Sequence, residues 1–210
     1  MRTRLKICGF TDVESAVYAA RLGVDAIGLV FYEKSTRHVT LEQAIAITHA
    51  LPPFASVVGL FVDASEQAIR HILANVHLDY LQFHGEEPAS ACRIYGKRYV
   101  KAIRMHANID FDAIAREYHD AKGLLLDTYH PSTNGGTGEV FDWRLMPTRC
   151  PLPIILAGGL TVNNVKRAIQ TTRPYAIDVS SGVEIEKGKK DIVKMTAFTK
   201  KLQESDRDKL

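Results

Sequence analysis

Short apolar runs alternate with amphipathic runs along the whole chain. The apolar runs are nearly continuous, which is typical of strands that are buried on both faces. They predict strands over residues 5–8, 26–31, 56–62, 80–83, 99–103, 123–127, 154–156 and 176–179. The amphipathic runs predict helices over residues 12–22, 40–50, 65–75, 109–118, 163–170 and 191–202, a further helix from about residue 88, and a weak short helix near 141–145.

Local signals mark several of these helix starts. Asp12 and Thr40 are capping residue types, and an acidic residue follows each of them closely. Pro88 suits the first turn of a helix. The regular order gives eight strand–helix units of about 26 residues in a chain of 210, which predicts a parallel sheet. Eight units favour an α/β fold that closes into a single-domain (β/α)8 TIM barrel over residues 1–210. The alternative is a doubly wound sheet with fewer strands.

Composition and charge exclude several other classes of protein. The apolar fraction of 46% and charged fraction of 24% are ordinary for a soluble globular protein. The net charge is only +3 and the basic residues are scattered, so we expect no nucleic-acid partner. No apolar run is long enough to span a membrane, and the first residues lack the apolar stretch of a signal peptide, so we expect a cytoplasmic protein.

The three cysteines are widely spaced. Cys8, Cys92 and Cys150 form no CxxC motif, and their odd number argues against a disulfide framework or a zinc site. Cys92 falls in a predicted helix and Cys150 in a predicted loop, so both are interpreted as structural. Cys8 ends the first strand, two residues after Lys6 and on the same face. A neighbouring cation can lower a thiol pKa, which makes Cys8 a candidate reactive group; a buried structural cysteine is the alternative.

Small residues follow the last two strands, and they indicate a phosphate site. The first group includes Gly158 and Gly159, and the second consists of Ser180, Ser181 and Gly182. Small residues let backbone N–H groups approach an anion, and the next helix N-terminus adds a favourable dipole. In (β/α)8 barrels a phosphate is frequently bound by the loops after strands seven and eight.

Polar residues at the other strand ends are candidates for the chemistry, because barrel enzymes carry their active sites there. Asp127 ends an apolar strand, where a carboxylate must be solvated, paired or protonated. Arg37 could bind a carboxylate bidentately, or it could be a surface charge. Gln82 and His84 share one face of the fourth strand, and Asp178 lies in the eighth. A histidine satisfied by the backbone is the alternative for His84.

Together these residues carry a resemblance to the phosphoribosylanthranilate isomerases of tryptophan biosynthesis. The matching motifs, in chain order, are LKICGF at 5–10, SxRxV at 35–39, VGLFV at 58–62, LQFHGEE at 81–87, LLLDT at 124–128, GGTGEVFDW at 135–143, LAGGL at 156–160 and DVSSGVE at 178–184. They run the length of the chain in register. Two departures concern loop details: Glu33, Lys34 and Thr36 stand where the family usually has prolines around Ser35, and Asp63 stands where it more often has Asn.

The resemblance implies an Amadori rearrangement of N-(5-phosphoribosyl)anthranilate. In this family's mechanism Asp127 would be the general acid that opens the furanose ring, and Cys8, as thiolate, the general base at C2. Arg37 would bind the anthranilate carboxylate, and Asp178 a polar group of the substrate. The resemblance implies no metal and no cofactor. We expect a monomer rather than a homodimer, since no clear apolar patch is visible in the sequence.

Other barrel enzymes of sugar-phosphate metabolism fit the strand ends less well. An indole-glycerol-phosphate synthase would need a catalytic lysine and glutamates there. The histidine-pathway aminoaldose isomerase pairs two aspartates, whereas the first strand here offers Cys8. A metal-dependent epimerase would need ligands that His84 and His106 do not complete. A non-catalytic phosphate-binding module would have no use for Cys8, Asp127 and Arg37 together.

Overall fold

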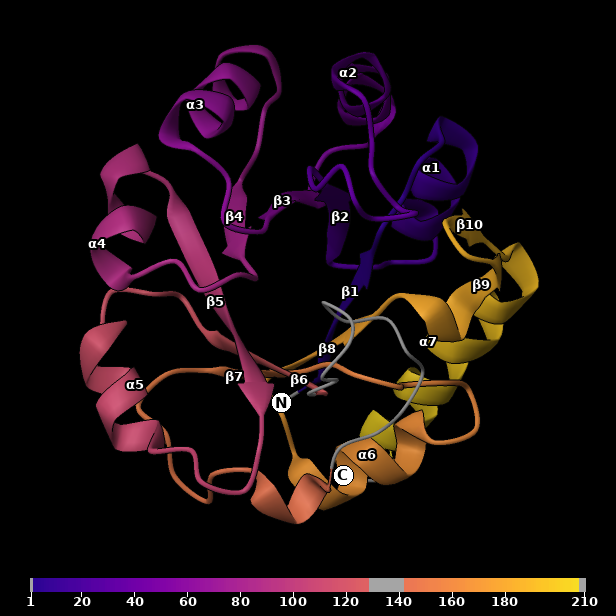
Figure 1. Ribbon diagram of the computed structural model, residues 1–210. Helices are drawn as coiled ribbons and strands as arrows, with labels where there is room; N and C mark the ends of the chain where they lie inside the picture. Colours follow the sequence, from indigo (N-terminus) through magenta and orange to yellow (C-terminus); the bar gives the residue numbers. More distant parts are fainter. Residues whose placement is uncertain (1, 129–141, 208–210) are drawn as a thin grey trace.

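Eight parallel strands form a closed barrel in the computed structural model, which describes residues 2–128 and 142–207. The strands follow one another around the barrel in chain order, and β1 pairs with both β2 and β8 (Figure 1). Their bounds are β1 Arg4–Cys8, β2 Ala26–Val30, β3 Ser56–Phe61, β4 Tyr80–Phe83, β5 Arg98–Met105, β6 Leu124–Thr128, β7 Ile154–Leu156 and β8 Ala176–Val179. The predicted barrel is therefore confirmed, and the doubly wound alternative is wrong.

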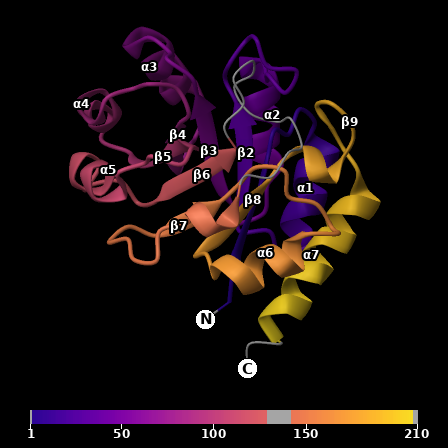
Figure 2. The same cartoon turned by 60° about the horizontal axis from the view of Figure 1, so that its bottom comes forward.

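Helices surround the barrel on its outside (Figures 1 and 2). They are α1 Val13–Arg21, α2 Leu41–Ala50, α3 Glu66–Asn75, α4 Ala89–Cys92, α5 Phe111–Glu117, α6 Val165–Thr172 and α7 Ile192–Arg207, with 3-10 helices η1 Arg93–Tyr95, η2 Trp143–Leu145 and η3 Ser181–Val183. Between β6 and β7 the described residues contain only η2. Within residues 2–128 and 142–207, every helix is too short or too polar to cross a bilayer.

Successive residues of each strand point to opposite faces of the sheet, so they belong to different apolar clusters. The main core includes Leu5, Ile7, Ile27 and Leu29, which lie between the strands and the helices. Their neighbours along the strands point into the barrel. There, Val100, Ala102, Leu125 and Ala157 form one cluster, and Cys8, Val30, Leu60 and Val62 form another. The second cluster matters for function because it contains Cys8.

The caps explain where several helices begin. Asp12 and Thr40 cap their helices, as the sequence signals indicated: the Asp12 side chain accepts from Ser15 N and that of Thr40 from Gln43 N. Gln43, which was not predicted, completes a reciprocal capping box with Thr40. The prediction for Pro88 was wrong in detail, because this residue precedes α4 with an extended backbone instead of occupying its first turn. The fourth helix is a single α turn followed by η1, and it ends at Gly96 in a left-handed conformation.

A two-stranded antiparallel hairpin follows β8 and was not predicted. It consists of β9 Glu184–Glu186 and β10 Lys189–Lys190, and it lies beside α7 at the edge of the barrel (Figure 1). Its sequence, EIEKGKK, is charged and has no apolar run, so the periodicity that revealed the other strands was missing.

Candidate active site

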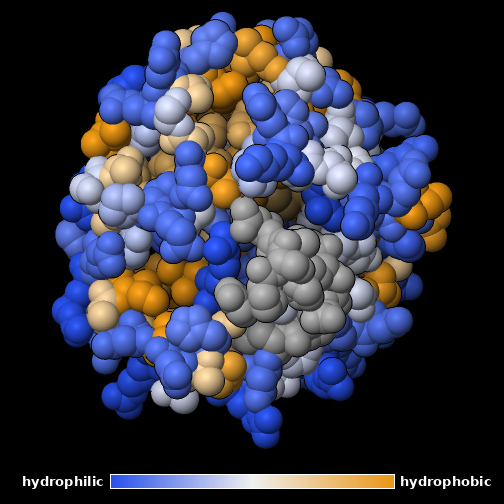
Figure 3. Space-filling model, viewed as in Figure 1, coloured by the Kyte–Doolittle hydropathy of each residue, from blue (hydrophilic) through white to orange (hydrophobic). Residues whose placement is uncertain are grey.

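Polar side chains also point into the barrel, beside the two inward apolar clusters. Lys6, Gln82, His84, Asp127 and Asp178 are all buried. They come from strands β1, β4, β6 and β8, so the closed barrel collects side chains that are far apart in the sequence. Figure 3 shows that the face seen in Figure 1 is mostly hydrophilic around its edge and is hollowed near its middle. The closed barrel therefore brings these predicted residues together inside it.

Cys8 lies at the end of β1 with its side chain over Gly28. The two residues are register partners, and a Cβ atom added to Gly28 would lie 2.7 Å from Cys8 Sγ. A glycine within an otherwise apolar strand often marks such a close approach. Cys8 is 5% exposed and packs against Val30, Leu60 and Val62. The thiol therefore adjoins an apolar surface inside the barrel.

Lys6 and Asp178 form a buried ion pair below Cys8. They are register partners in β1 and β8, and Lys6 Nζ donates to Asp178 Oδ2 at 2.8 Å. The other carboxylate oxygen, Asp178 Oδ1, is buried and has no hydrogen-bond donor among the described residues. A buried acceptor without a partner is costly, so this oxygen is available to a ligand hydroxyl or N–H group.

The structure does not make Cys8 a low-pKa thiol, contrary to the expectation from Lys6 alone. Burial raises the pKa of the Cys8 thiol above its ordinary value, and Asp178 adds to the rise, while the nearby Lys6 and Lys190 lower it. Burial also opposes the charge of Lys6, but Asp178 and Cys8 keep the pKa of Lys6 above its ordinary value. The expectation was wrong because the sequence shows the lysine but not the depth of the site.

Asp127 is held by a short chain of hydrogen bonds that starts on β4. Its Oδ2 lies 3.1 Å from His84 Nε2, and its Oδ1 accepts from Thr128 N at 2.8 Å. On the other side of the ring, Gln82 Nε2 lies 3.0 Å from His84 Nδ1. If Gln82 donates to Nδ1, then His84 carries its proton on Nε2 and donates it to Asp127. Gln82 and His84 therefore orient the Asp127 carboxylate. All three residues were predicted to lie at the mouth of the barrel.

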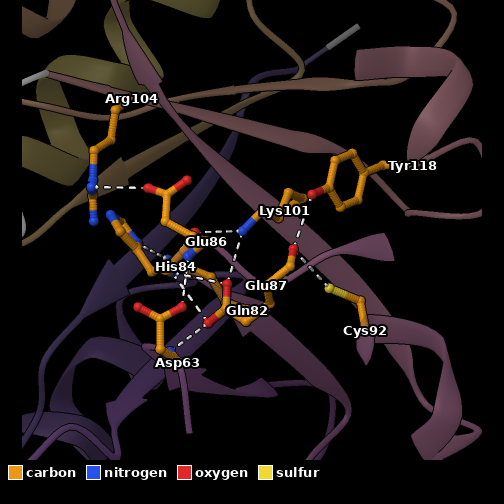
Figure 4. A network of polar contacts seen from close by, with 10 residues as sticks. Asp63, Gln82, His84, Glu86, Glu87, Cys92, Lys101, Arg104 and Tyr118 are labelled. Atoms are coloured by element: carbon orange, nitrogen blue, oxygen red, sulfur yellow. Dashed lines mark hydrogen bonds and ion pairs between the residues drawn. The ribbon is translucent and has the colours of Figure 1, made fainter. Parts of the chain in front are cut away.

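A second buried ion pair supports the chain around His84. Lys101 Nζ donates to Glu87 Oε2 at 2.8 Å and to Gly85 O, and the Glu87 carboxylate also accepts from Gly85 N and Asp63 N (Figure 4). Glu87 thus joins the turns after β3 and β4 to β5. Asp63 has a positive φ of 48°, a conformation that Asp and Asn tolerate best. Its Oδ1 accepts from Glu86 N, a role that the amide oxygen of Asn could also fill.

The turns after β7 and β8 lie directly against each other. A Cβ atom at Gly182 would overlap the carbonyl oxygen of Leu160. Asn164 was not predicted; it fixes the first turn by accepting from Thr161 N and donating to Gly159 O. Among the described residues, the backbone N–H groups of Gly158, Gly159, Ser181 and Gly182 have no hydrogen-bond acceptor. The two predicted phosphate turns are thus adjacent and carry unpaired donors.

The Ser180 side chain is engaged within the protein. Its Oγ donates to Cys8 O at 2.9 Å, which ties the end of β8 to the end of β1. Lys190 Nζ lies 3.3 Å from both Ser180 O and Ser180 Oγ. Ser180 therefore connects the proposed phosphate turn to Cys8 as well as lying within that turn.

Arg37 lies across Gly9, the residue after Cys8. Its Nε and Nη2 donate to Glu184 at 2.7 and 2.8 Å, and Lys190 Nζ donates to the same carboxylate at 2.7 Å. The sequence singled out Arg37 but neither Glu184 nor Lys190. Glu184 was part of the DVSSGVE motif, but the motif did not indicate that the Glu184 side chain is buried against Arg37.

Part of the expected site falls outside the described residues. Residues 135–141 of the GGTGEVFDW motif at 135–143 belong to this part of the chain. Within residues 2–128 and 142–207, no three His, Cys, Asp or Glu side chains are grouped as metal ligands would be.

Nearly the whole chain matches one protein family. The family model described as N-(5'-phosphoribosyl)anthranilate (PRA) isomerase matches residues 5–201. The N-(5'-phosphoribosyl)anthranilate isomerase of Nitrosococcus oceani is 53% identical over 198 residues, which cover 94% of this chain and 96% of the relative. The chain belongs to the N-(5'-phosphoribosyl)anthranilate isomerase family. The resemblance first seen in the motifs is thereby confirmed.

Solved structures of the family have the same fold. The phosphoribosyl anthranilate isomerase of Thermotoga maritima is 39% identical with a TM-score of 0.87, over 96% of this chain and 99% of that one. Another solved phosphoribosyl anthranilate isomerase, in complex with reduced 1-(o-carboxyphenylamino)-1-deoxyribulose 5-phosphate, is 36% identical with a TM-score of 0.81, again over 96% of this chain and 99% of that one.

Proposed function

We propose that this protein converts N-(5'-phosphoribosyl)anthranilate to 1-(2-carboxyphenylamino)-1-deoxyribulose 5-phosphate, a step of tryptophan biosynthesis. The single observation that carries the proposal is the family match over residues 5–201, which includes all eight barrel strands except the first residue of β1. A related structure is a complex with the reduced product of this reaction. The residues at the mouth of the barrel supply the groups that such a reaction needs.

The substrate would lie across the mouth of the barrel. Its phosphate would bind the N–H groups of Gly158, Gly159, Ser181 and Gly182, which have no acceptor in the described part of the chain, with Ser180 beside them. The aromatic ring would pack on the apolar cluster of Cys8, Val30, Leu60 and Val62. Arg37 would bind the ring carboxylate, and Asp178 Oδ1 would accept from a substrate hydroxyl. This placement brings the reacting carbons between phosphate and ring.

Asp127 would act as the general acid in the first step. It gives a proton to the furanose ring oxygen while the lone pair on the anilinic nitrogen forms the C1=N bond, so the C1–O bond breaks and the ring opens. Gln82 and His84 keep the carboxyl group aimed through the chain described above. The electron pair comes from the substrate nitrogen, so this step calls for no metal or cofactor.

Cys8 would act as the general base in the second step. The thiolate takes the proton from C2, the C2 electrons form a C1=C2 bond, and the nitrogen regains its lone pair. The resulting enolamine takes a proton at C1 and loses the C2 hydroxyl proton, which gives the ketone. Since burial raises the pKa of the Cys8 thiol, Lys6 and Lys190 are needed to favour the thiolate.

The test is turnover of freshly generated substrate, followed by the loss of its anthranilate-type fluorescence. Cys8→Ala and Asp127→Asn should each lower kcat by about 10²–10⁴-fold, the usual range for a general acid or base. Both variants should still bind the reduced product analogue. Wild-type turnover in either variant would remove that residue from the mechanism, and an inactive wild-type protein would refute the proposed function.

Two features of the setting belong to the same proposal. We place the enzyme in the cytoplasm, a reducing compartment, in agreement with its three free cysteines.

We also propose that it works as a monomer, because the exposed large apolar residues, such as Phe54, Ile94 and Val193, are distributed over different elements. Sedimentation equilibrium tests this: a stable dimer at micromolar concentration would overturn it.

A further inference from the structure

Glu184 is the buried centre of a cluster of three charges at the side of the mouth. Its side chain is 4% exposed, that of Lys190 is fully buried, and that of Arg37 is 13% exposed. Arg37 binds both carboxylate oxygens of Glu184, while Lys190 shares Oε1. Burial opposes the charge of Glu184, but these two cations lower the pKa of the carboxyl below its ordinary value. The cluster therefore holds two cations and one anion.

The contact with Glu184 fixes which edge of Arg37 is free. Nε and Nη2 are used by Glu184, and Nη1 has no partner among the described residues. A bidentate pair holds the planar guanidinium in one orientation, whereas a lone arginine would sample many rotamers. The free edge is therefore presented in a defined direction, while the aliphatic part of Arg37 packs against Gly9, the residue after Cys8.

The hairpin that carries Glu184 and Lys190 is itself anchored to the segment before Arg37. Gly188, at the hairpin turn, has a φ of +86°, and a Cβ atom there would overlap the carbonyl oxygen of Thr36. Thr11 Oγ1 donates to Gly188 O at 2.9 Å. Lys190 also reaches Ser180, which in turn donates to Cys8 O. The hairpin thus ties Arg37 to the same strand ends that hold Cys8.

We propose that Glu184, supported by Lys190, is the positioning residue that aims Arg37 at the carboxylate of the substrate, and so sets the specificity for an aniline that carries this carboxylate. This inference rests on the proposed function and on the placement of Arg37 in it. The surplus positive charge of the cluster complements an anionic group, and the fixed edge of Arg37 selects its position. Preorganisation of this kind improves binding because less side-chain freedom is lost on association.

The test compares two probes that differ only in the ring carboxylate. They are reduced 1-(o-carboxyphenylamino)-1-deoxyribulose 5-phosphate and the same compound with an unsubstituted phenyl ring. In the wild-type protein the first should bind more tightly. In Glu184→Gln the affinity for the first probe should fall by about 10- to 100-fold, the usual effect of a charge-assisted hydrogen bond, and the affinity for the second should stay within about threefold. KM should rise accordingly, with little change in kcat.

Glu186→Gln is the matched control, because Glu186 lies on the same strand but is exposed and pairs only with Lys189 among the described residues. It should leave both affinities unchanged. Equal weakening of both probes in Glu184→Gln would indicate a purely structural role, and unchanged or tighter binding of the carboxylate probe would show that positioning is unimportant. Either result overturns the inference.

If Glu184→Gln fails to fold, Arg37→Lys decides the question. The lysine keeps the charge but cannot be held by a bidentate pair, so the preference for the carboxylate probe should be lost. A retained preference overturns the positioning role. These outcomes are separate from the proposed function, which fails only if the wild-type protein does not turn over the substrate. If Arg37→Ala retains the preference, both the carboxylate contact and the role of Glu184 are refuted.

Discussion

Cys8 combines deep burial with two neighbouring cations, and the balance between them decides its chemistry. In the free protein burial prevails and raises the pKa of the thiol. A base that is mostly protonated at neutral pH removes a proton more slowly, but each thiolate is a stronger base. The enzyme therefore depends on Lys6 and Lys190 to keep a usable fraction of thiolate.

The three thiols should react at very different rates with a disulfide reagent at pH 8. Cys150 is partly exposed, whereas Cys8 and Cys92 are buried. Burial also raises the pKa of Cys92 to about 12. We expect one fast thiol in the native protein and three after denaturation, measured by the released thiolate of the reagent. Rapid loss of two or three thiols would show that the buried positions open readily, and Cys150→Ser should abolish the fast phase.

The strand-end candidates could be predicted because alternation along a strand and the barrel rule together specify where a side chain lies. Lys6, Cys8 and Asp127 follow from this reasoning. Glu184 and Lys190 could not, because their importance comes from contacts with Arg37, 147 residues earlier than Glu184 in the chain. The raised pKa of Cys8 was equally invisible, since burial depth depends on the whole barrel.

Lys6→Met should destabilise the protein more than a double substitution that removes both charges of the pair. The substitution leaves the Asp178 carboxylate buried without its cation, which typically costs about 3–5 kcal/mol of unfolding free energy. Lys6→Met combined with Asp178→Asn should recover most of this loss. Urea denaturation measures both. The single variant should also raise the pKa of Cys8 further, because a lysine that lowers it is removed. Equal stability of the single and double variants would contradict the pairing.

At the scale of elements, the two turns after β7 and β8 act as one unit. Each presents backbone N–H groups, and their close contact at Gly182 and Leu160 sets the separation of those groups. The sequence indicated the two turns through their small residues. It did not indicate Asn164, whose side chain fixes the first turn, because a lone asparagine after a strand has many possible roles.

Gly182→Ala should weaken substrate binding through the phosphate. The added methyl group would overlap Leu160 O and force the two turns apart, so we expect KM to rise by about tenfold or more. Gly23→Ala is the control: no atom lies within 4 Å, but its φ of +83° strains an alanine, so it should cost about 1–2 kcal/mol of stability without raising KM. An unchanged KM in Gly182→Ala would count against a phosphate at this place.

The strands themselves were the most predictable elements. Three of the eight, β4, β7 and β8, have the predicted bounds, and the others differ by a few residues at their ends. This follows from their burial on both faces, which requires continuous apolar runs. The hairpin β9–β10 was not predicted, because it is stabilised by ion pairs and by contacts with the segment at Thr36. Such contacts leave no periodic pattern of apolar residues in the sequence.

At the scale of the whole molecule, the barrel is closed by contacts between the first and last parts of the chain. Beyond the pairing of β1 with β8, the Asp206 carboxylate at the end of α7 accepts from Thr3 N at 2.7 Å and from Thr3 Oγ1 at 2.8 Å. Figure 2 shows both ends of the chain on the same side of the molecule. The last turn of α7 therefore belongs to the fold, although its sequence resembles a frayed helix end.

Asp206→Ala should lower the unfolding free energy by about 1–3 kcal/mol, because a buried N–H group and a hydroxyl lose a charged acceptor. Thr3 is only 2% exposed, so water cannot easily replace the carboxylate. Calorimetry checks this, and KM should not change. Glu204→Ala, which removes an exposed ion pair with Lys201, should stay within about 0.5 kcal/mol. If the two variants are equally stable, the contact does not help to close the barrel.

The pairing of Lys6 with Asp178 also has a consequence for synthesis on the ribosome. The two residues are 172 positions apart, so at about 5–20 residues per second roughly 10–30 seconds pass between their translation. During this time β1 has only β2 as a neighbour, and the lysine in its middle has no counter-ion. A charge at this place opposes burial of the unfinished strand edge, so we expect it to disfavour premature pairing and aggregation of the nascent chain. The ion pair beneath Cys8 can therefore form only when the last strand has been made.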